Sequence, residues 1–71
     1  MSYWISVKGN KNIRIDDNFV PRIGETVLLL PDTFEGQEEE LKFRVIDVIY
    51  TVGRFGSPKE TPLLILGPKD Q

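Results

Sequence analysis

Two residue types that carry most enzyme chemistry are missing from this chain of 71 residues, which has no cysteine and no histidine. A Ser-His or Cys-His pair for nucleophilic catalysis therefore cannot form. A pair of catalytic carboxylates needs a cleft, which a domain this small can hardly hold. The segment Gly53-Arg54-Phe55-Gly56 matches neither nucleotide-binding fingerprint. We predict that the protein is not an enzyme and that it uses no cofactor.

The acidic residues gather in one segment, residues 32–40 (DTFEGQEEE), which we name the acidic loop. It carries Asp32, Glu35, Glu38, Glu39 and Glu40 and no basic residue. The rest of the chain then has nine basic and six acidic residues, a net charge of +3 against −2 for the whole chain. Such a loop can bind a basic protein surface, or occupy one by mimicking nucleic-acid phosphates. The alternative is a solvated loop whose charge only repels other molecules.

The spacing of these carboxylates bears on metal binding. Calcium loops place oxygen ligands at regular alternate positions around a glycine, and the acidic loop does not match that spacing. We predict no metal site.

A second candidate for protein contact is the glycine-rich loop, residues 53–60 (GRFGSPKE). Arg54 and Phe55 stand between two glycines there, and loops of this kind often form binding surfaces. We expect the acidic loop and the glycine-rich loop to be presented to one protein partner. The alternative is a flexible connector whose Phe55 folds back to cap the core.

Aromatic and basic residues make nucleic acid the second candidate ligand. The set is Trp4, Tyr50, Lys8, Lys11 and Arg14, because bases stack on aromatic rings and phosphates attract lysine and arginine. The competing interpretation places Trp4 under a loop or over an open barrel end and uses the lysines to protect an edge strand. Since a few scattered charges on an acidic protein are a weak electrostatic footprint, we rank nucleic acid below a protein partner.

The central strand is predicted over residues 41–52 (LKFRVIDVIYTV), which are mostly β-branched or aromatic. Strict alternation would place Asp47 among apolar side chains, where an unpaired carboxylate is costly. A bulge near residues 46–47 removes the conflict, with Phe43 and Val45 facing inward before it and Val48, Tyr50 and Val52 after it. The other solution is a bent strand that lends its faces to two sheets. Asp47 is expected to pair with an arginine or to be exposed at the bulge, instead of marking a site.

The remaining segments supply partners for this strand. Residues 3–16 alternate around Gly9-Asn10 and predict a hairpin. Residues 17–24 form a connector in which Phe19, Val20 and Ile23 are expected to plug the barrel end. Residues 25–30 predict a strand antiparallel to the central one, and residues 61–66 predict the last strand, with Pro62 at an edge or entry position.

The pattern predicts an all-β fold: a small, five-stranded, partly open antiparallel barrel. An SH3-like barrel is our first choice and an OB-like barrel the alternative, because the OB fold usually has a helix for which this chain offers no segment. Residues 1–67 form the single domain and residues 68–71 a frayed tail. Uninterrupted apolar runs such as Val27–Leu30 are too short to cross a bilayer, so we expect no membrane association.

The segment Pro21-Arg22-Ile23-Gly24-Glu25 and the later Phe43-Arg44-Val45-Ile46-Asp47-Val48-Ile49-Tyr50 follow a recognisable order. It resembles a group of small uncharacterised bacterial and phage-borne proteins with an SH3-like barrel, in which a PRIGE turn precedes a strand and an F-x-V-x-D-V-x-Y strand follows a hairpin. The resemblance covers the middle half of the chain. It implies the fold and no established activity, so no functional residue is carried over.

These observations together predict a non-catalytic protein-interaction module, encoded on a phage or other mobile element. The partner would have a basic or nucleic-acid-binding surface. Two alternatives stay open, a nucleic-acid-binding barrel and a structural or accessory subunit that assembles with other copies of itself. The lack of cysteine and of a secretory signal makes the cytoplasm the expected compartment.

Overall fold

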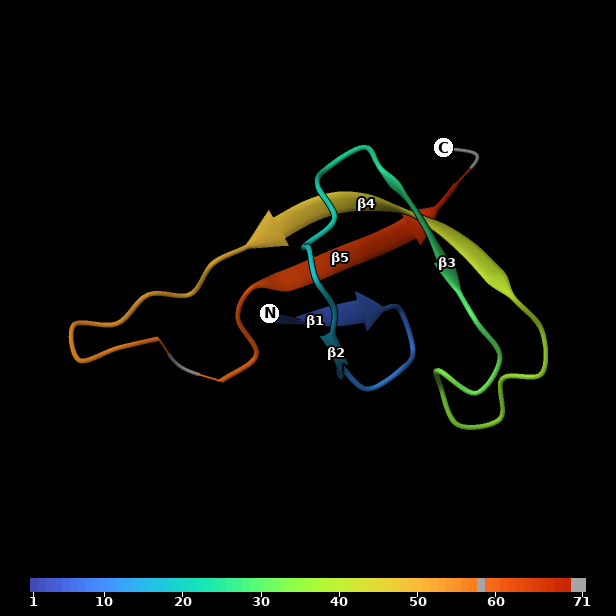
Figure 1. Cartoon of the computed structure of the whole chain (residues 1–71), viewed down its shortest axis with the longest axis horizontal. Coiled ribbons are helices and arrows are strands. Elements are labelled where there is room, and N and C mark those ends of the chain that lie inside the picture. The colour runs from blue at the N-terminus through green and yellow to red at the C-terminus, as the bar shows by residue number, and fades with distance from the viewer. Residues whose placement is uncertain (58, 70–71) are drawn as a thin grey trace.

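The structure, a computed structural model, describes residues 1–57 and 59–69. The described chain forms five strands and contains no helix. They are β1 (Ser2–Val7), β2 (Ile13–Asp16), β3 (Thr26–Leu29), β4 (Leu41–Ile49) and β5 (Leu63–Pro68). Figure 1 shows β4 and β5 side by side, with the acidic loop and the glycine-rich loop extending beyond them.

The strands form one sheet in the order β2-β1-β5-β4-β3, so the last strand of the sequence lies in the middle. β1 pairs antiparallel with β2, and β4 pairs antiparallel with both β3 and β5, as expected for the two hairpins. The pairing of β1 with β5 is parallel, so the prediction of an antiparallel barrel is wrong for this pair of strands. The sheet is therefore organised around residues 63–68, with residues 41–49 beside them.

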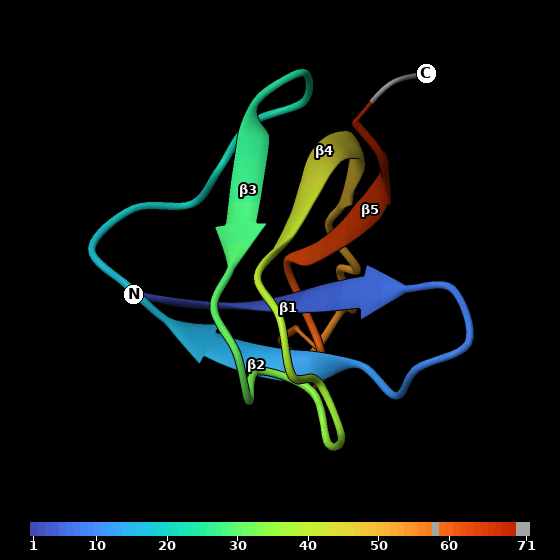
Figure 2. The ribbon, with the colours of Figure 1, turned by 90° about the vertical axis from the view of Figure 1, so that its right-hand side faces the viewer.

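The sheet curls into a half-barrel, and the prediction of a small, partly open, five-stranded all-β barrel is confirmed. In Figure 2, β3 ends above β1, and the coil that follows β3 passes in front of β1 and β2. Among the described residues, β2 pairs only with β1 and β3 pairs only with β4, so each of these two strands has an unpaired edge. The barrel is open between β2 and β3.

The predicted bulge in β4 is confirmed. Val45 is opposite Leu66 and Asp47 is opposite Ile65, so Ile46 is the extra residue on β4. Val45 is completely buried before the bulge, and Val48 contacts the core after it. The inward placement of Tyr50 and Val52 is wrong, because β4 ends at Ile49 and their side chains are 66% and 80% exposed.

The core lies inside the curl. Ile5 from β1, Val45 from β4 and Leu64 from β5 are at most 1% exposed, and Tyr3, Leu29, Phe34 and Leu66 complete the buried cluster. Period-two alternation along β1 points Tyr3 and Ile5 inward and leaves Trp4, which is half-buried, on the outer face.

The connector between β2 and β3 closes the barrel less than the sequence predicted. Pro21 is buried and Val20 contacts the core, but Phe19 and Ile23 are 65% and 62% exposed. The expectation that all three apolar residues plug the barrel end is therefore wrong for Phe19 and Ile23. Gly24 has φ 92°, and its N–H donates to Val45 O at 2.8 Å. This turn fixes where β3 begins.

The last strand also differs at both of its ends. Pro62 precedes β5 and is an entry residue, not an edge residue, because β5 lies between β1 and β4 in the middle of the sheet. Pro68, expected in the tail, lies in β5 opposite Phe43. The rest of that expected tail includes residues 70 and 71, which are outside the described residues.

Tyr3 gives the core a dependence on pH. Burial, and to a smaller extent the negative charge of Asp17, raises the pKa of its phenol. The folded state therefore disfavours the phenolate. The contribution of Tyr3 to the free energy of unfolding is fully present below its pKa in the unfolded state, about 10. It is lost as the pH rises toward and through the higher pKa of the folded state.

We expect the unfolding free energy of the wild type to decline above about pH 10, and the Tyr3→Phe variant to lose less stability over the same range. Urea unfolding at a series of alkaline pH values measures how steeply the unfolding free energy of the wild type and of Tyr3→Phe falls with pH. The Tyr50→Phe variant, which keeps Tyr3 and removes only the hydroxyl of an exposed residue, is the matched control and should retain the wild-type decline. Parallel slopes for the wild type and Tyr3→Phe would contradict the assignment.

Candidate functional site

The acidic loop is held together by one glutamine side chain. Gln37 Oε1 accepts a hydrogen bond from Phe34 N at 3.0 Å, and Gln37 Nε2 donates to Leu29 O at 3.2 Å and to Glu39 O at 2.8 Å. Backbone bonds add to this arrangement, since Gln37 N donates to Phe34 O at 3.1 Å and Asp32 N donates to Gln37 O at 3.2 Å. The loop therefore has a defined backbone conformation.

Phe34 anchors this loop to the barrel. Its side chain is only 6% exposed and belongs to the same buried cluster as Ile5 and Leu64. The sequence predicts a polar loop over residues 32–40 and does not predict this anchor. A single large aromatic residue inside an otherwise polar segment is the signal that could have revealed it.

The entry and the tip of the loop have their own local structure. Thr33 N and Oγ1 both donate to Leu30 O, at 3.3 and 2.7 Å. Gly36 has φ 82°, a conformation that glycine adopts without steric cost. These features turn the chain sharply on both sides of Phe34.

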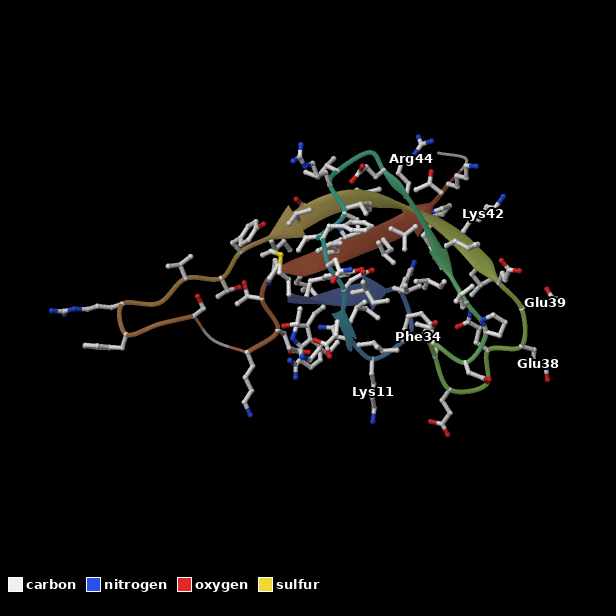
Figure 3. The ribbon with its side chains drawn as sticks, viewed as in Figure 1. Lys11, Phe34, Glu38, Glu39, Lys42 and Arg44 are labelled. Carbon is white, nitrogen blue, oxygen red and sulfur yellow. The ribbon has the colours of Figure 1, made fainter. Side chains whose placement is uncertain are left out.

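The five carboxylates of the loop point outward. Asp32, Glu35, Glu38, Glu39 and Glu40 are all exposed, and Figure 3 shows Glu38 and Glu39 directed away from the molecule while Phe34 points toward it. Within residues 1–57 and 59–69, none of these carboxylates forms an ion pair. The same residues contain no cluster of three groups placed to hold a metal ion. The loop presents concentrated negative charge on a fixed backbone.

The glycine-rich loop has a small, well-defined tip. Gly53 N donates to Gly56 O at 3.1 Å and Gly56 N donates to Gly53 O at 3.2 Å, which leaves Arg54 and Phe55 as the tip residues. Phe55 is 94% exposed, so the alternative in which it folds back on the core is wrong. The Arg54 guanidinium lies 5.4 Å from the centre of the Phe55 ring, a cation–π contact. Pro58 of this loop lies outside the described residues.

The structure does not bring the two candidate loops together. In Figure 1 the glycine-rich loop extends from one end of the long axis, and the acidic loop lies at the other end. The molecule measures 40 × 25 × 25 Å along its principal axes. A partner that contacts both loops must therefore extend along the longest dimension of the protein.

The residues proposed for nucleic acid are also divided. Trp4 is directly opposite Arg14 in the β1–β2 pair, so these two side chains share the outer face of the sheet. Arg14, however, forms an ion pair with Asp16 at 3.5 Å. Tyr50 instead lines a separate hollow with residues 20–23 of the connector.

The basic turn of the first hairpin lies beside the acidic loop. A hollow of about 500 Å³ is lined by residues 9–13, which include Lys11, and by Phe34 and Glu35. A phosphate that approaches Lys11 would therefore meet the charge of Glu35 in the same hollow. This juxtaposition weakens the nucleic-acid interpretation of Lys11.

Asp47 lies at the surface of the sheet. Its side chain is exposed beside the bulge, and its carboxylate accepts a hydrogen bond from the adjacent Val48 N at 2.9 Å. Exposure at a bulge, one of the two outcomes expected from the sequence, is confirmed.

Comparison with known protein families, with curated proteins and with solved structures found no match to this chain. Within the described residues, the structure holds no helix of the length and apolar character that crossing a bilayer requires.

Proposed function

We propose that the chain is a non-catalytic protein-interaction module and that the acidic loop binds a basic surface of a protein partner. The observation that supports this most directly is the fixed backbone of the loop, anchored by buried Phe34 and bonded through Gln37. A preorganised loop loses little conformational entropy when it binds, so its exposed carboxylates can contribute more of their attraction to affinity. A loop that served solubility alone would need no such anchor.

The exposed tip of the glycine-rich loop is a second contact surface in this proposal. Arg54 and Phe55 form an amphipathic pair with a large apolar ring in solvent. Aromatic residues and arginine are enriched among the residues that dominate protein interfaces. Because this tip lies at the opposite end of the molecule, it contacts either a second partner or a distant part of a long one.

Nucleic acid remains the second candidate, supported by the adjacent Trp4 and Arg14 on the outer face of the sheet. A structural subunit is the third. A reducing compartment such as the cytoplasm fits a chain without cysteine.

Affinity capture with matched variants tests the proposal. The variant Glu38→Gln, Glu39→Gln, Glu40→Gln removes three loop carboxylates and keeps their size. We expect it to capture the partner about tenfold less well than the wild type, since each exposed ion pair contributes about 0.2–1 kcal/mol. The control Asp16→Asn, Asp47→Asn, Glu60→Gln removes the same charge elsewhere and should capture normally. Equal capture by both variants would count against the acidic loop.

A further inference from the structure

The opening between β2 and β3 forms a groove, which we name the seam groove. One side of the groove is lined by residues 26–30, which are β3 and the residue that follows it. The rest of the lining includes Tyr3 and Ile5 of β1, Ile15 of β2, Asp17 and Phe19 of the connector, and Thr33 of the acidic loop. Its volume is about 360 Å³, within the range of about 300–1,000 Å³ found for ligand pockets. Figure 2 shows that β2 and β3, the two edge strands of the sheet, lie apart.

The lining residues show that the groove runs along the edge of β3. Successive side chains of a strand point to opposite faces of the sheet, so a hollow on one face contacts only alternate residues. The seam groove instead contacts every residue from 26 to 30. It therefore lies beside the backbone of β3, on the side away from β4.

The polar groups of that edge can be assigned from the ladder. Val45 N donates to Glu25 O at 2.9 Å, and the register pairs Thr26 with Arg44 and Leu28 with Lys42. In an antiparallel pair the residues that bond across the ladder alternate with residues whose N–H and C=O point outward. Thr26 and Leu28 are the outward-pointing residues, so their backbone groups face the seam groove.

The surroundings of this edge are apolar. Tyr3 and Ile5 are buried at its floor, and Phe19, Leu28 and Leu30 along it are 65%, 45% and 60% exposed. An edge strand with exposed apolar side chains and unpaired backbone groups is a template for a further strand. A strand that paired there would place alternate side chains over the barrel interior and beside Leu28.

Charge selects the occupant. Asp17 borders the groove, its Oδ1 accepts a hydrogen bond from Asn18 N at 2.7 Å, and no cation of the described residues pairs with it. At Thr33 the groove continues into the acidic loop. A second copy of this chain would bring its own acidic loop and Asp17 to the same negative surroundings, whereas a basic segment would be attracted.

We propose that the seam groove is a peptide-binding site, in which an extended segment of another protein, with alternating apolar residues and a lysine or arginine beside Asp17, pairs with the edge of β3 and closes the barrel. The segment binds by strand addition: backbone hydrogen bonds supply affinity, and the apolar floor and Asp17 supply selectivity. This site is separate from the carboxylates of the acidic loop and binds its segment whether or not those carboxylates are occupied.

The test uses the full chain and a synthetic peptide that begins with lysine, followed by alternating valine and threonine; its N-terminus is acetylated and its lysine side chain keeps its charge. Amide hydrogen exchange is followed by NMR. At saturating peptide we expect exchange of the Thr26 and Leu28 amides to slow about tenfold or more, because their N–H groups gain acceptors. The same peptide with N-methyl groups on its pairing edge should bind about tenfold more weakly, which tests the backbone bonds without altering the protein.

Two variants test the role of charge. Asp17→Asn should weaken binding of the lysine peptide about two- to fivefold, as expected for an exposed ion pair. Asp47→Asn, which removes an exposed carboxylate outside the groove, is the matched control and should bind the peptide normally.

Three results would overturn the proposal. The first is that millimolar peptide changes neither the NMR chemical shifts nor the exchange rates of the Thr26 and Leu28 amides. The second is a set of chemical-shift changes confined to residues 35–40 that disappears in the Glu38→Gln, Glu39→Gln, Glu40→Gln variant. This result would show that the peptide binds the acidic loop instead of the seam groove. The third is that the Thr26 and Leu28 amides exchange slowly in the absence of peptide, and that their exchange slows further as the protein concentration rises. This result would identify a second copy of the chain as the occupant of the groove.

Discussion

Replacing Phe34 with alanine is expected to lower the free energy of unfolding by about 3–5 kcal/mol, as other buried phenylalanine truncations do. The side chain is only 6% exposed and sits in the core cluster, although it belongs to a loop. A domain of this size has a total stability of only several kcal/mol, so the variant should be close to unfolding. Chemical denaturation of the wild type and Phe34→Ala measures the difference.

The same variant should also release the acidic loop. With the anchor gone, the hydrogen bonds from Asp32 N to Gln37 O and from Gln37 N to Phe34 O lose their support, so both amides should exchange faster than those of β4. Phe55→Ala truncates an aromatic ring that is 94% exposed and is the matched control, expected to change stability by less than about 0.5 kcal/mol. Equal effects of the two truncations would show that Phe34 does not anchor the loop.

The second large effect is expected at the centre of the sheet. Leu64 is completely buried on β5, opposite Ile5 of β1 and Val48 of β4. Leu64→Ala should lower the free energy of unfolding by about 2–5 kcal/mol, because the rigid strands on both sides cannot collapse into the space left. Chemical denaturation again gives the difference.

Leu30→Ala removes the same atoms from a side chain that is 60% exposed, and it should change stability by less than about 0.5 kcal/mol. If Leu64→Ala lowered the free energy of unfolding as little as this control, β5 could not lie at the centre of the core.

Local signals predicted the local parts of this fold. The Gly9-Asn10 turn and the alternation on either side of it predicted the first hairpin, and Asp47 within an apolar run predicted the bulge at Ile46. Each of these features depends on residues close together in the sequence. Fold class follows from them, since strands joined by short polar loops leave few architectures other than a small barrel.

The features that the sequence did not predict depend on distant contacts. The parallel pairing of β1 with β5 joins residues 4–7 to residues 63–66, and no local pattern encodes it. Phe19 and Ile23 are exposed because the barrel stays open beside the connector, which alternation and turn chemistry do not determine. The exposed ends of the central run, Tyr50 and Val52, extend past the residues that β5 can pair with.

The candidate site shows the same division. Composition alone located the acidic loop, because charge is a property of the residues themselves. Its fixed conformation depends on Gln37 reaching Leu29 O and on Phe34 reaching the core, and neither contact follows from residue type. The separation of the acidic loop from the glycine-rich loop depends on the topology of the whole sheet.

The proposed function depends on a fixed acidic loop that binds basic protein. The most direct measurement is a pair of NMR titrations of the full chain, one with a ten-residue peptide of alternating lysine and glycine and one with a single-stranded oligonucleotide. We expect the peptide to shift amides of residues 35–40 in a saturable manner, and the oligonucleotide to leave Trp4, Lys8 and Arg14 unshifted. Oligonucleotide shifts at those three residues, with no peptide shifts in the acidic loop, would contradict the proposed function and favour a nucleic-acid-binding barrel.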